Sequence, residues 1–284
     1  MFAPITRVYG KNYSDFLTYD GELPPYERNH LKMPDSLSQN LEHLRRWQKE
    51  FAGDSFDFDY HLMWAHVGDP GYEACAKNLF QDMKDLHLIG LDGMVSCQVQ
   101  RSYLPTALPV LSMAAALWDE KASYEALAND YYLAAFGSDG PKIRQMLIRL
   151  SSLFHFYEGP ARSAAASLSG CDDPAEARRL LEQLKALLKK DLCSSNAASD
   201  DAVTDSVIPF PADQSAYDRH ALLVYADFLT GLCGVLEKAA LGDPDEAKAA
   251  AEKLILSLWE KEPAIQPLLD VQNTVRVLSG FFQA

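Results

Sequence analysis

Alternating and continuous hydrophobic segments in the first 120 residues predict three strands. The first covers residues 1–9 (MFAPITRVY), and the second covers residues 56–64 (FDFDYHLMW), where aromatic and polar residues alternate. The third covers residues 88–97, in which Gly90 and Gly93 permit close approach of the backbone. Apolar stretches of this length are typical of strands buried inside a sheet.

Helical periodicity follows each predicted strand. Ser36 has the character of an N-cap, and leucines and a tryptophan recur at helical spacing up to about residue 51. Residues 72–87 and 110–118 carry the same kind of apolar stripe. Strands alternating with helices indicate a parallel sheet with crossover helices. Three such units do not close a barrel, which needs eight units over about 250 residues.

From residue 123 onward the strand pattern stops and helices are predicted to the end of the chain. Asp173-Pro174 and Asp243-Pro244 each place a capping residue before a proline at the first helical position. We expect helices at about 123–136, 141–158, 174–192, 213–240, 244–260 and 263–282. The predicted fold class is therefore α/β plus all-α: a partial (β/α)8-type barrel of about three βα units in residues 1–121, then a helical bundle in residues 122–284.

Composition and charge narrow the classes of partner. The 284 residues have a net charge of −14, which leaves no basic face for nucleic acid. The longest apolar run, Ala107–Trp118, is shorter than the ~20 residues that a membrane span needs. The five cysteines are widely spaced with no CxxC pair, so we expect neither a metal site nor a disulfide framework. No cofactor is predicted.

The start of the chain bears on localisation. A predicted strand begins at residue 1 with no preceding cap or turn, so we expect that a segment belonging before it is absent. No charged segment leads into an apolar one, and no secretory signal is visible. The chain as given is expected in the cytoplasm, and export of a longer natural form stays open.

Acidic and aromatic residues in the second predicted strand form the first candidate site. Alternation puts Asp57, Asp59 and His61 on one face, with Trp64 and His66 after them. Aromatic rings stack on sugar faces while carboxylates accept hydroxyl protons, so this set suits carbohydrate chemistry. The structural alternatives are a solvated Asp57 and a His61 satisfied inside the core. The spacing of the two histidines matches no helical metal-ligand pair.

Polar residues near the ends of the other two strands form the second candidate set. Gln98, Gln100 and Arg101 follow the third strand, and Arg7 ends the first, where ligands of parallel sheets bind. The alternative is a polar loop. Asp92 either faces a ligand or belongs to a turn. No GxSxG, Walker A, GxGxxG or HExxH motif is present.

Five segments, taken in order, resemble one known family. They are APITR (3–7), NLEHLRRWQK (40–49), FDFDYHLMW (56–64), IGLDGMVSCQ (89–98) and LPVLSMAAALWDEKASYEALANDYYLAAFG (108–137). Together they resemble the family filed as domain of unknown function 4838, from carbohydrate-degrading bacteria. The resemblance covers roughly the first 140 residues well and the helical remainder loosely.

The resemblance implies a relative of α-glucuronidases and hexosaminidases, with an eight-stranded barrel followed by a helical domain. It implies glycoside hydrolysis by paired carboxylates and sugar-stacking aromatics. This chain departs from that pattern because it resembles only the later part of the barrel. No pair of acidic residues carries over, and the best matched positions are Asp59, Tyr60 and the segment 98–101, which look more like substrate contacts than a complete dyad.

The resulting hypothesis is a glycoside-hydrolase-like protein that acts on or binds polysaccharide-derived sugars and is incomplete as a stand-alone enzyme. The alternatives are a non-catalytic carbohydrate-binding or scaffold module, and a half-barrel completed by a partner chain or by a second copy. Asp59 is the candidate catalytic residue. The candidate substrate contacts are Arg7, Tyr60, His61, Trp64, His66, Asp92, Gln98, Gln100 and Arg101.

Overall fold

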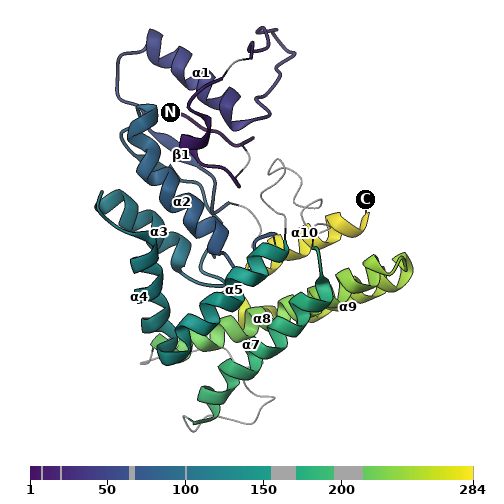
Figure 1. The fold of residues 1–284 in the computed structure, drawn as a ribbon. Coiled ribbons are helices and arrows are strands. Elements are labelled where there is room, and N and C mark those ends of the chain that lie inside the picture. Colours follow the sequence, from purple (N-terminus) through teal and green to yellow (C-terminus); the bar gives the residue numbers. More distant parts are fainter. Residues whose placement is uncertain are drawn as a thin grey trace.

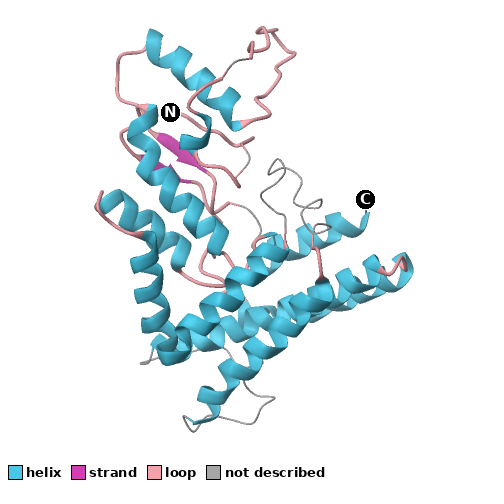
Figure 2. Cartoon of the chain, viewed as in Figure 1, coloured by secondary structure: helices cyan, strands magenta, loops and turns pink. Residues whose placement is uncertain are grey.

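The computed structural model describes residues 1–7, 9–19, 21–63, 68–99, 101–154, 171–194 and 214–283, without the side chains of 191–194 and 280–283. About 65% of the structure is helical. Figure 1 shows the N-terminal elements gathered at one end of the molecule, with longer helices crossing one another at the other end. Figure 2 shows how little of the chain is strand.

One small parallel sheet is present in the described residues. It pairs β1 (Asp57–Asp59) with β2 (Met94–Ser96), in a register that sets Phe58 opposite Val95. Phe2 adds a single parallel bridge to Asp57 on the other side of β1. The predicted partial (β/α)8-type barrel of about three βα units is therefore wrong, because the described part of the first 120 residues holds only this two-stranded sheet among helices and loops.

Local turns shorten the first predicted strand to one bridge. The backbone N–H of Ile5 donates to Ala3 O at 2.9 Å, and that of Arg7 donates to Pro4 O at 3.0 Å. These bonds bend the chain directly after Phe2. Pro4 also lacks the N–H that a ladder would need, so the extended segment ends where the proline begins.

The third predicted strand begins later than its apolar run indicates. Leu86–Ile89 forms a 3-10 helix (η3) that continues the helix Glu73–Asp85 (α2), and Gly90 ends it with a φ of 71°. A short apolar run fits a helical turn or a buried strand equally well by periodicity alone. Gly90 favours the helical turn over a strand, because glycine adopts the left-handed conformation that ends a helix without steric cost.

The helices of the N-terminal half agree well with the periodicity. They are α1 (Leu37–Glu50), α2 (Glu73–Asp85), α3 (Leu108–Trp118) and α4 (Tyr124–Phe136). Ser36 caps α1 as predicted, since its Oγ accepts from the N–H of Gln39 at 3.3 Å. A 3-10 helix, Tyr13–Phe16 (η1), precedes them.

The predicted helices of the C-terminal half are also confirmed, with shifted ends. The structure has α5 (Gly140–Leu153), α7 (Pro174–Ser194), α8 (Gln214–Ala240), α9 (Pro244–Ile265) and α10 (Val271–Gln283). The helix predicted over 244–260 continues to Ile265, so Pro263 lies inside α9. Helix α5 ends at Leu153, five residues before its predicted end at 158, because Phe154 is extended.

Helix α8 forms the centre of the C-terminal half. It is 27 residues long and apolar enough to cross a membrane by length and composition, but 67% of its most apolar window is buried. Its neighbours are α7 and α9. The buried apolar side chains form one cluster in space, and its members come from Phe2 through to Leu278 in the sequence. The domain boundary predicted near residue 121 stays a prediction.

Gly71 provides a test of how α5 packs against the loop before α2. A Cβ at this position would lie 1.9 Å from the backbone oxygen of Leu147 and 2.5 Å from Ser151 Oγ. We expect Gly71→Ala to lower the free energy of unfolding by about 3 kcal/mol, because the backbone of α5 has to move. Urea unfolding followed by circular dichroism measures the change.

The matched control is Gly234→Ala in α8, where a Cβ meets nothing within 4 Å. This variant should be unchanged or more stable by up to about 1 kcal/mol, since alanine favours a helix interior. Equal stabilities of the two variants would contradict the close packing at Gly71.

Candidate functional site

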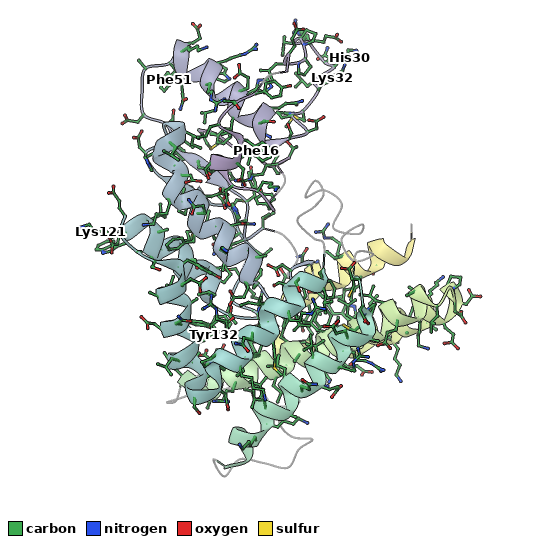
Figure 3. All side chains as sticks on the ribbon, viewed as in Figure 1. Phe16, His30, Lys32, Phe51, Lys121 and Tyr132 are labelled. Carbon is green, nitrogen blue, oxygen red and sulfur yellow. The ribbon has the colours of Figure 1, made fainter. Side chains whose placement is uncertain are left out.

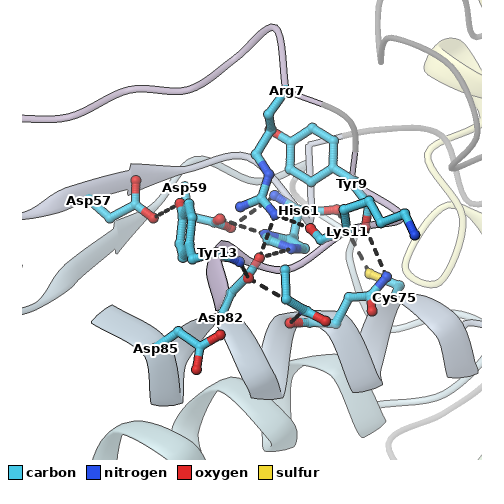
Figure 4. A network of polar contacts seen from close by, with 12 residues as sticks. Arg7, Tyr9, Lys11, Tyr13, Asp57, Asp59, His61, Cys75, Asp82 and Asp85 are labelled. Carbon is cyan, nitrogen blue, oxygen red and sulfur yellow. Dashed lines mark hydrogen bonds and ion pairs between the residues drawn. The ribbon is translucent and has the colours of Figure 1, made fainter. Parts of the chain in front are cut away.

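A network of buried charged side chains lies between the sheet and α2. Arg7 enters from the N-terminal segment, Asp59 and His61 from the end of β1, and Asp82 from the middle of α2 (Figure 4). None of these four side chains has any exposed area. The structure thus brings Arg7, from the second candidate set, together with Asp59 and His61 from the first.

Ion pairs and a hydrogen bond connect the side chains of this network. Arg7 Nη2 lies 2.7 Å from Asp82 Oδ2 and donates to the carbonyl oxygen of Lys11 at 2.6 Å. His61 lies between two carboxylates, with Nδ1 2.5 Å from Asp59 Oδ2 and Nε2 3.1 Å from Asp82 Oδ2. Each cation therefore has a carboxylate partner, which buried charges require.

Aromatic rings and a third carboxylate, Asp57, surround these charges. The Arg7 guanidinium lies 4.5 Å from the ring centroid of Tyr13 and 5.2 Å from that of Tyr9. Tyr9 also meets the His61 ring edge to face at 4.8 Å. Tyr13 donates its hydroxyl hydrogen to Asp57 Oδ2 at 2.6 Å. These contacts attach the N-terminal segment to β1 and α2.

The charges of the network set the pKa values within it. Burial alone lowers the pKa of His61, but Asp59 and Asp82 outweigh it and raise the pKa to about 9. Burial raises the pKa of Asp82, yet Arg7 and His61 hold it below its ordinary value. Two cations thus face two carboxylates. Burial and the charge of Asp59 raise the pKa of Asp57 to about 7, because ionised Asp57 adds a further buried negative charge.

This geometry limits what the network can do. A histidine held by a carboxylate is a common arrangement for general base catalysis. Here both side chains are fully buried, and Tyr9 covers the imidazole. A substrate could reach Asp59 only if the N-terminal segment moved away. The assignment of Asp59 as a catalytic residue stays a prediction, while its observed contacts hold the fold together.

Asp82 and Tyr13 are the members of the network that the sequence analysis missed. Asp82 lies on the apolar stripe of α2 beside Leu79 and Met83, and its Oδ1 accepts from the backbone N–H of Tyr13 at 2.9 Å. Acidic residues among the apolar positions of α2, with Asp82 between Leu79 and Met83, were the available signal. Its partner, Arg7, is 75 residues away in sequence, so pattern alone could not pair them.

A buried carboxylate outside this network, Asp69, joins α2 to α5. It accepts from the backbone N–H groups of Tyr72 and Cys75, at 3.1 and 2.8 Å, and from the hydroxyl of Ser151. Burial raises its pKa to about 6 in spite of these bonds. Asp69 therefore satisfies N–H groups at the start of α2.

The predicted contacts at the carboxyl ends of the strands lie apart from the buried network. Tyr60 is half-buried and packs edge to face on Phe58 at 5.3 Å. Gln98 is exposed, and its Oε1 accepts from Ser96 Oγ at 3.2 Å. Arg101 Nε donates to the backbone oxygen of Gln266, after α9, so it connects the two halves of the chain. Trp64, His66 and Gln100 lie outside the described residues.

Asp92 lies before β2 and lines a cleft of about 560 Å³ between α2 and α3, here called the α2–α3 cleft. Its exposed polar lining includes His87 from η3 and Glu120 after α3. Asp92 Oδ2 accepts from the backbone N–H of Ser55 at 3.4 Å, so the residue also serves the turn role that was the structural alternative. The remaining lining side chains are those of Gln81, Met83, Lys84, Asp85, Leu86, Leu91, Ala116 and Leu117.

Among the described residues, no group of three or more histidine, cysteine or acidic side chains is placed to hold a metal ion. The four cysteines whose side chains the structure describes, Cys75, Cys97, Cys171 and Cys233, form no disulfide. Comparison of the chain with protein-family models, with curated proteins and with solved structures found no match.

Removal of Arg7 tests whether the network supports the fold. We expect Arg7→Met to lower the free energy of unfolding by about 3–5 kcal/mol, because buried Asp82 would lose the closer of its two cationic partners. Arg46→Met is the matched control: Arg46 is 57% exposed and pairs with Glu42 at 3.1 Å, so its loss should cost no more than about 1 kcal/mol. If both variants lost the same free energy of unfolding, the buried ion pair would contribute no more to stability than the exposed one.

Stability should fall as the pH rises from about 4 to 9. Folded Asp57 keeps its proton up to about pH 7, whereas the unfolded residue loses it near 3.8, so its contribution declines between these values. Folded His61 stays protonated up to about pH 9 against 6.5 when unfolded, so its stabilising charge is lost over that range.

Urea unfolding measured from pH 4 to 9 checks this dependence. Asp57→Asn keeps an acceptor for Tyr13 without the ionisation, so its stability should fall less between pH 4 and 7 than that of the wild type. A wild-type stability that rises across the whole range would contradict the arrangement of charges.

Proposed function

We propose that the protein binds carbohydrate in the α2–α3 cleft. The observation that carries the proposal is Trp118, the last residue of α3, whose side chain is 92% exposed. It directly follows Leu117 and stands two residues before Glu120, and both of these line the cleft. Figure 3 labels Lys121 in the adjoining α3–α4 connection, which projects from one side of the molecule.

An exposed tryptophan ring gains more free energy by contact with a sugar ring than by contact with water. Its large apolar face has no partner in the described fold, and a pyranose ring offers a matching apolar face. Leu117, the preceding residue, is 45% exposed and lines the cleft itself. A ligand that covers both side chains removes apolar area from water, which is the main source of its binding free energy.

Polar groups in the cleft can bind sugar hydroxyls. Asp92 and Glu120 supply exposed carboxylate acceptors. The Nδ1 of His87 lies 2.7 Å from the carbonyl oxygen of Lys84; because a carbonyl only accepts, Nδ1 carries the proton and Nε2 is an acceptor. Lys84 is engaged elsewhere, since its Nζ donates to Asp119 O at 2.6 Å.

Binding without hydrolysis is the version of the proposal that the geometry favours. Asp59, the candidate catalytic residue, is fully buried and belongs to the ion-pair network. Hydrolysis is the second candidate, because Asp92 and Glu120 place two exposed carboxylates in one cleft, and paired carboxylates carry out glycoside hydrolysis. The resemblance to carbohydrate-degrading proteins supports either version.

Substitution of Trp118 tests the proposal. We expect glucuronoxylan or an N-acetylglucosamine hexamer to bind the wild type in isothermal titration, and Trp118→Ala to weaken binding about tenfold, which corresponds to about 1.4 kcal/mol. Trp259→Ala on α9 is the matched control, because that tryptophan is 47% exposed and lies outside the cleft. Its affinity should equal that of the wild type.

Two outcomes would contradict the proposal: no binding of either sugar by the wild type, or equal affinities of wild type and Trp118→Ala. Assays for released reducing sugar on the same samples separate binding from hydrolysis. Turnover by the wild type that disappears in both Asp92→Asn and Glu120→Gln, with binding retained, would replace the binding version with the enzyme.

A further inference from the structure

A second concave surface lies on the opposite side of β1 from β2 and is mainly apolar. It has a volume of about 580 Å³ and is bounded by residues Met1–Ala3, by the loop Leu31–Pro34 and by one side of α1; we call it the α1 groove. In Figure 3, Phe51 marks the end of α1 and Lys32 marks the loop.

The side chains of the α1 groove are unusually exposed for their size and apolarity. Leu31 is 66% exposed, Met33 52%, Trp47 71% and Phe51 56%. Four large apolar side chains around one concavity form a contiguous patch, and such patches mark interaction sites more often than isolated exposed residues do. Methionine and aromatic side chains are also enriched at protein-binding surfaces.

One wall of the groove is an open edge of extended backbone. Phe2 uses both of its backbone groups on the β1 side: its N–H donates to Phe56 O at 2.9 Å, and its carbonyl accepts from Phe58 at 2.7 Å. Backbone groups alternate in direction along extended chain, so those of Met1 and Ala3 point away from β1. Within the described residues, the carbonyl of Met1 and the N–H of Ala3 make no hydrogen bond. Open edges of this kind accept further strands.

The charge of the groove differs from that of the whole chain. The chain has 40 acidic against 26 basic residues, yet none of the described residues that line the groove is acidic. Among those lining residues, the side chains that can carry charge are Lys32 and His43. The groove is therefore complementary to a ligand that carries negative charge.

We propose that the α1 groove binds an extended polypeptide segment with alternating apolar side chains and an acidic residue, which adds as a strand beside Met1–Ala3. The free N–H and carbonyl bind the backbone of the segment, Met33, Trp47 and Phe51 receive its apolar side chains, and Lys32 pairs with its carboxylate. This surface is distinct from the α2–α3 cleft, since no residue lines both.

Two nine-residue probes test the proposal. Both are fluorescein-labelled peptides of alternating valine and threonine, one with two glutamates and the other with two lysines at the same positions. We expect the acidic peptide to bind the full chain at least fivefold more tightly in fluorescence anisotropy. Lys32→Glu should reverse this preference; it is a safe substitution for the fold because Lys32 is exposed on a loop.

Hydrogen exchange shows whether the peptide adds as a strand. The backbone N–H of Ala3 makes no hydrogen bond in the free protein, so saturating acidic peptide should slow its exchange at least fivefold. Binding that leaves this N–H unprotected would overturn strand addition.

Apolar recognition is tested with Met33→Asp, which should weaken the acidic peptide at least tenfold. Leu256→Asp on α9 is the matched control, because that leucine is 62% exposed and lies outside the groove. Equal weakening by both variants, or no binding of either peptide, would overturn the proposal. So would a dimer of the free protein in sedimentation that Met33→Asp dissociates, because a second copy would then occupy the groove.

Discussion

The ion pair between Arg7 and Asp82 is the interaction on which the N-terminal half depends. It joins the first residues of the chain to the middle of α2, at 2.7 Å and without exposed area. His61 extends the pair to β1 through its two carboxylate contacts. Two short strands and one bridge supply few backbone hydrogen bonds, so buried electrostatics take a larger part in holding this segment than they do in a large sheet.

The same network explains why the side chains that ligands can reach lie outside it. Asp59 and His61 face α2, and their charges are satisfied there. Groups that remain available to ligands are at the margins: Asp92 in the α2–α3 cleft, Trp118 at the end of α3, and the edge at Ala3 beside α1. A polar cleft and an apolar groove with an open strand edge suit different ligands, a sugar and a peptide.

Sequence patterns predicted the helices far better than the strands. The apolar stripes and caps of α1 and α4 depend on contacts within a few residues, which periodicity and the serines before them record. The first strand failed because hydrogen bonds around Pro4 turn the chain, and the third because Leu86–Ile89 extends α2 as a 3-10 helix. Apolar residues fit both outcomes, so composition could not distinguish them.

The sequence by itself determined where helices begin, which faces they bury, and that Arg7, Asp59 and His61 are chemically distinctive. Those features follow from side-chain type and local spacing. Only the tertiary structure decided that these three residues meet Asp82 in a sealed network, that Arg101 contacts Gln266, and that Asp92 lines one cleft with Leu117 and Glu120. Partners separated by tens to more than a hundred residues meet only when the whole chain packs, because burial and charge pairing are properties of the assembled fold.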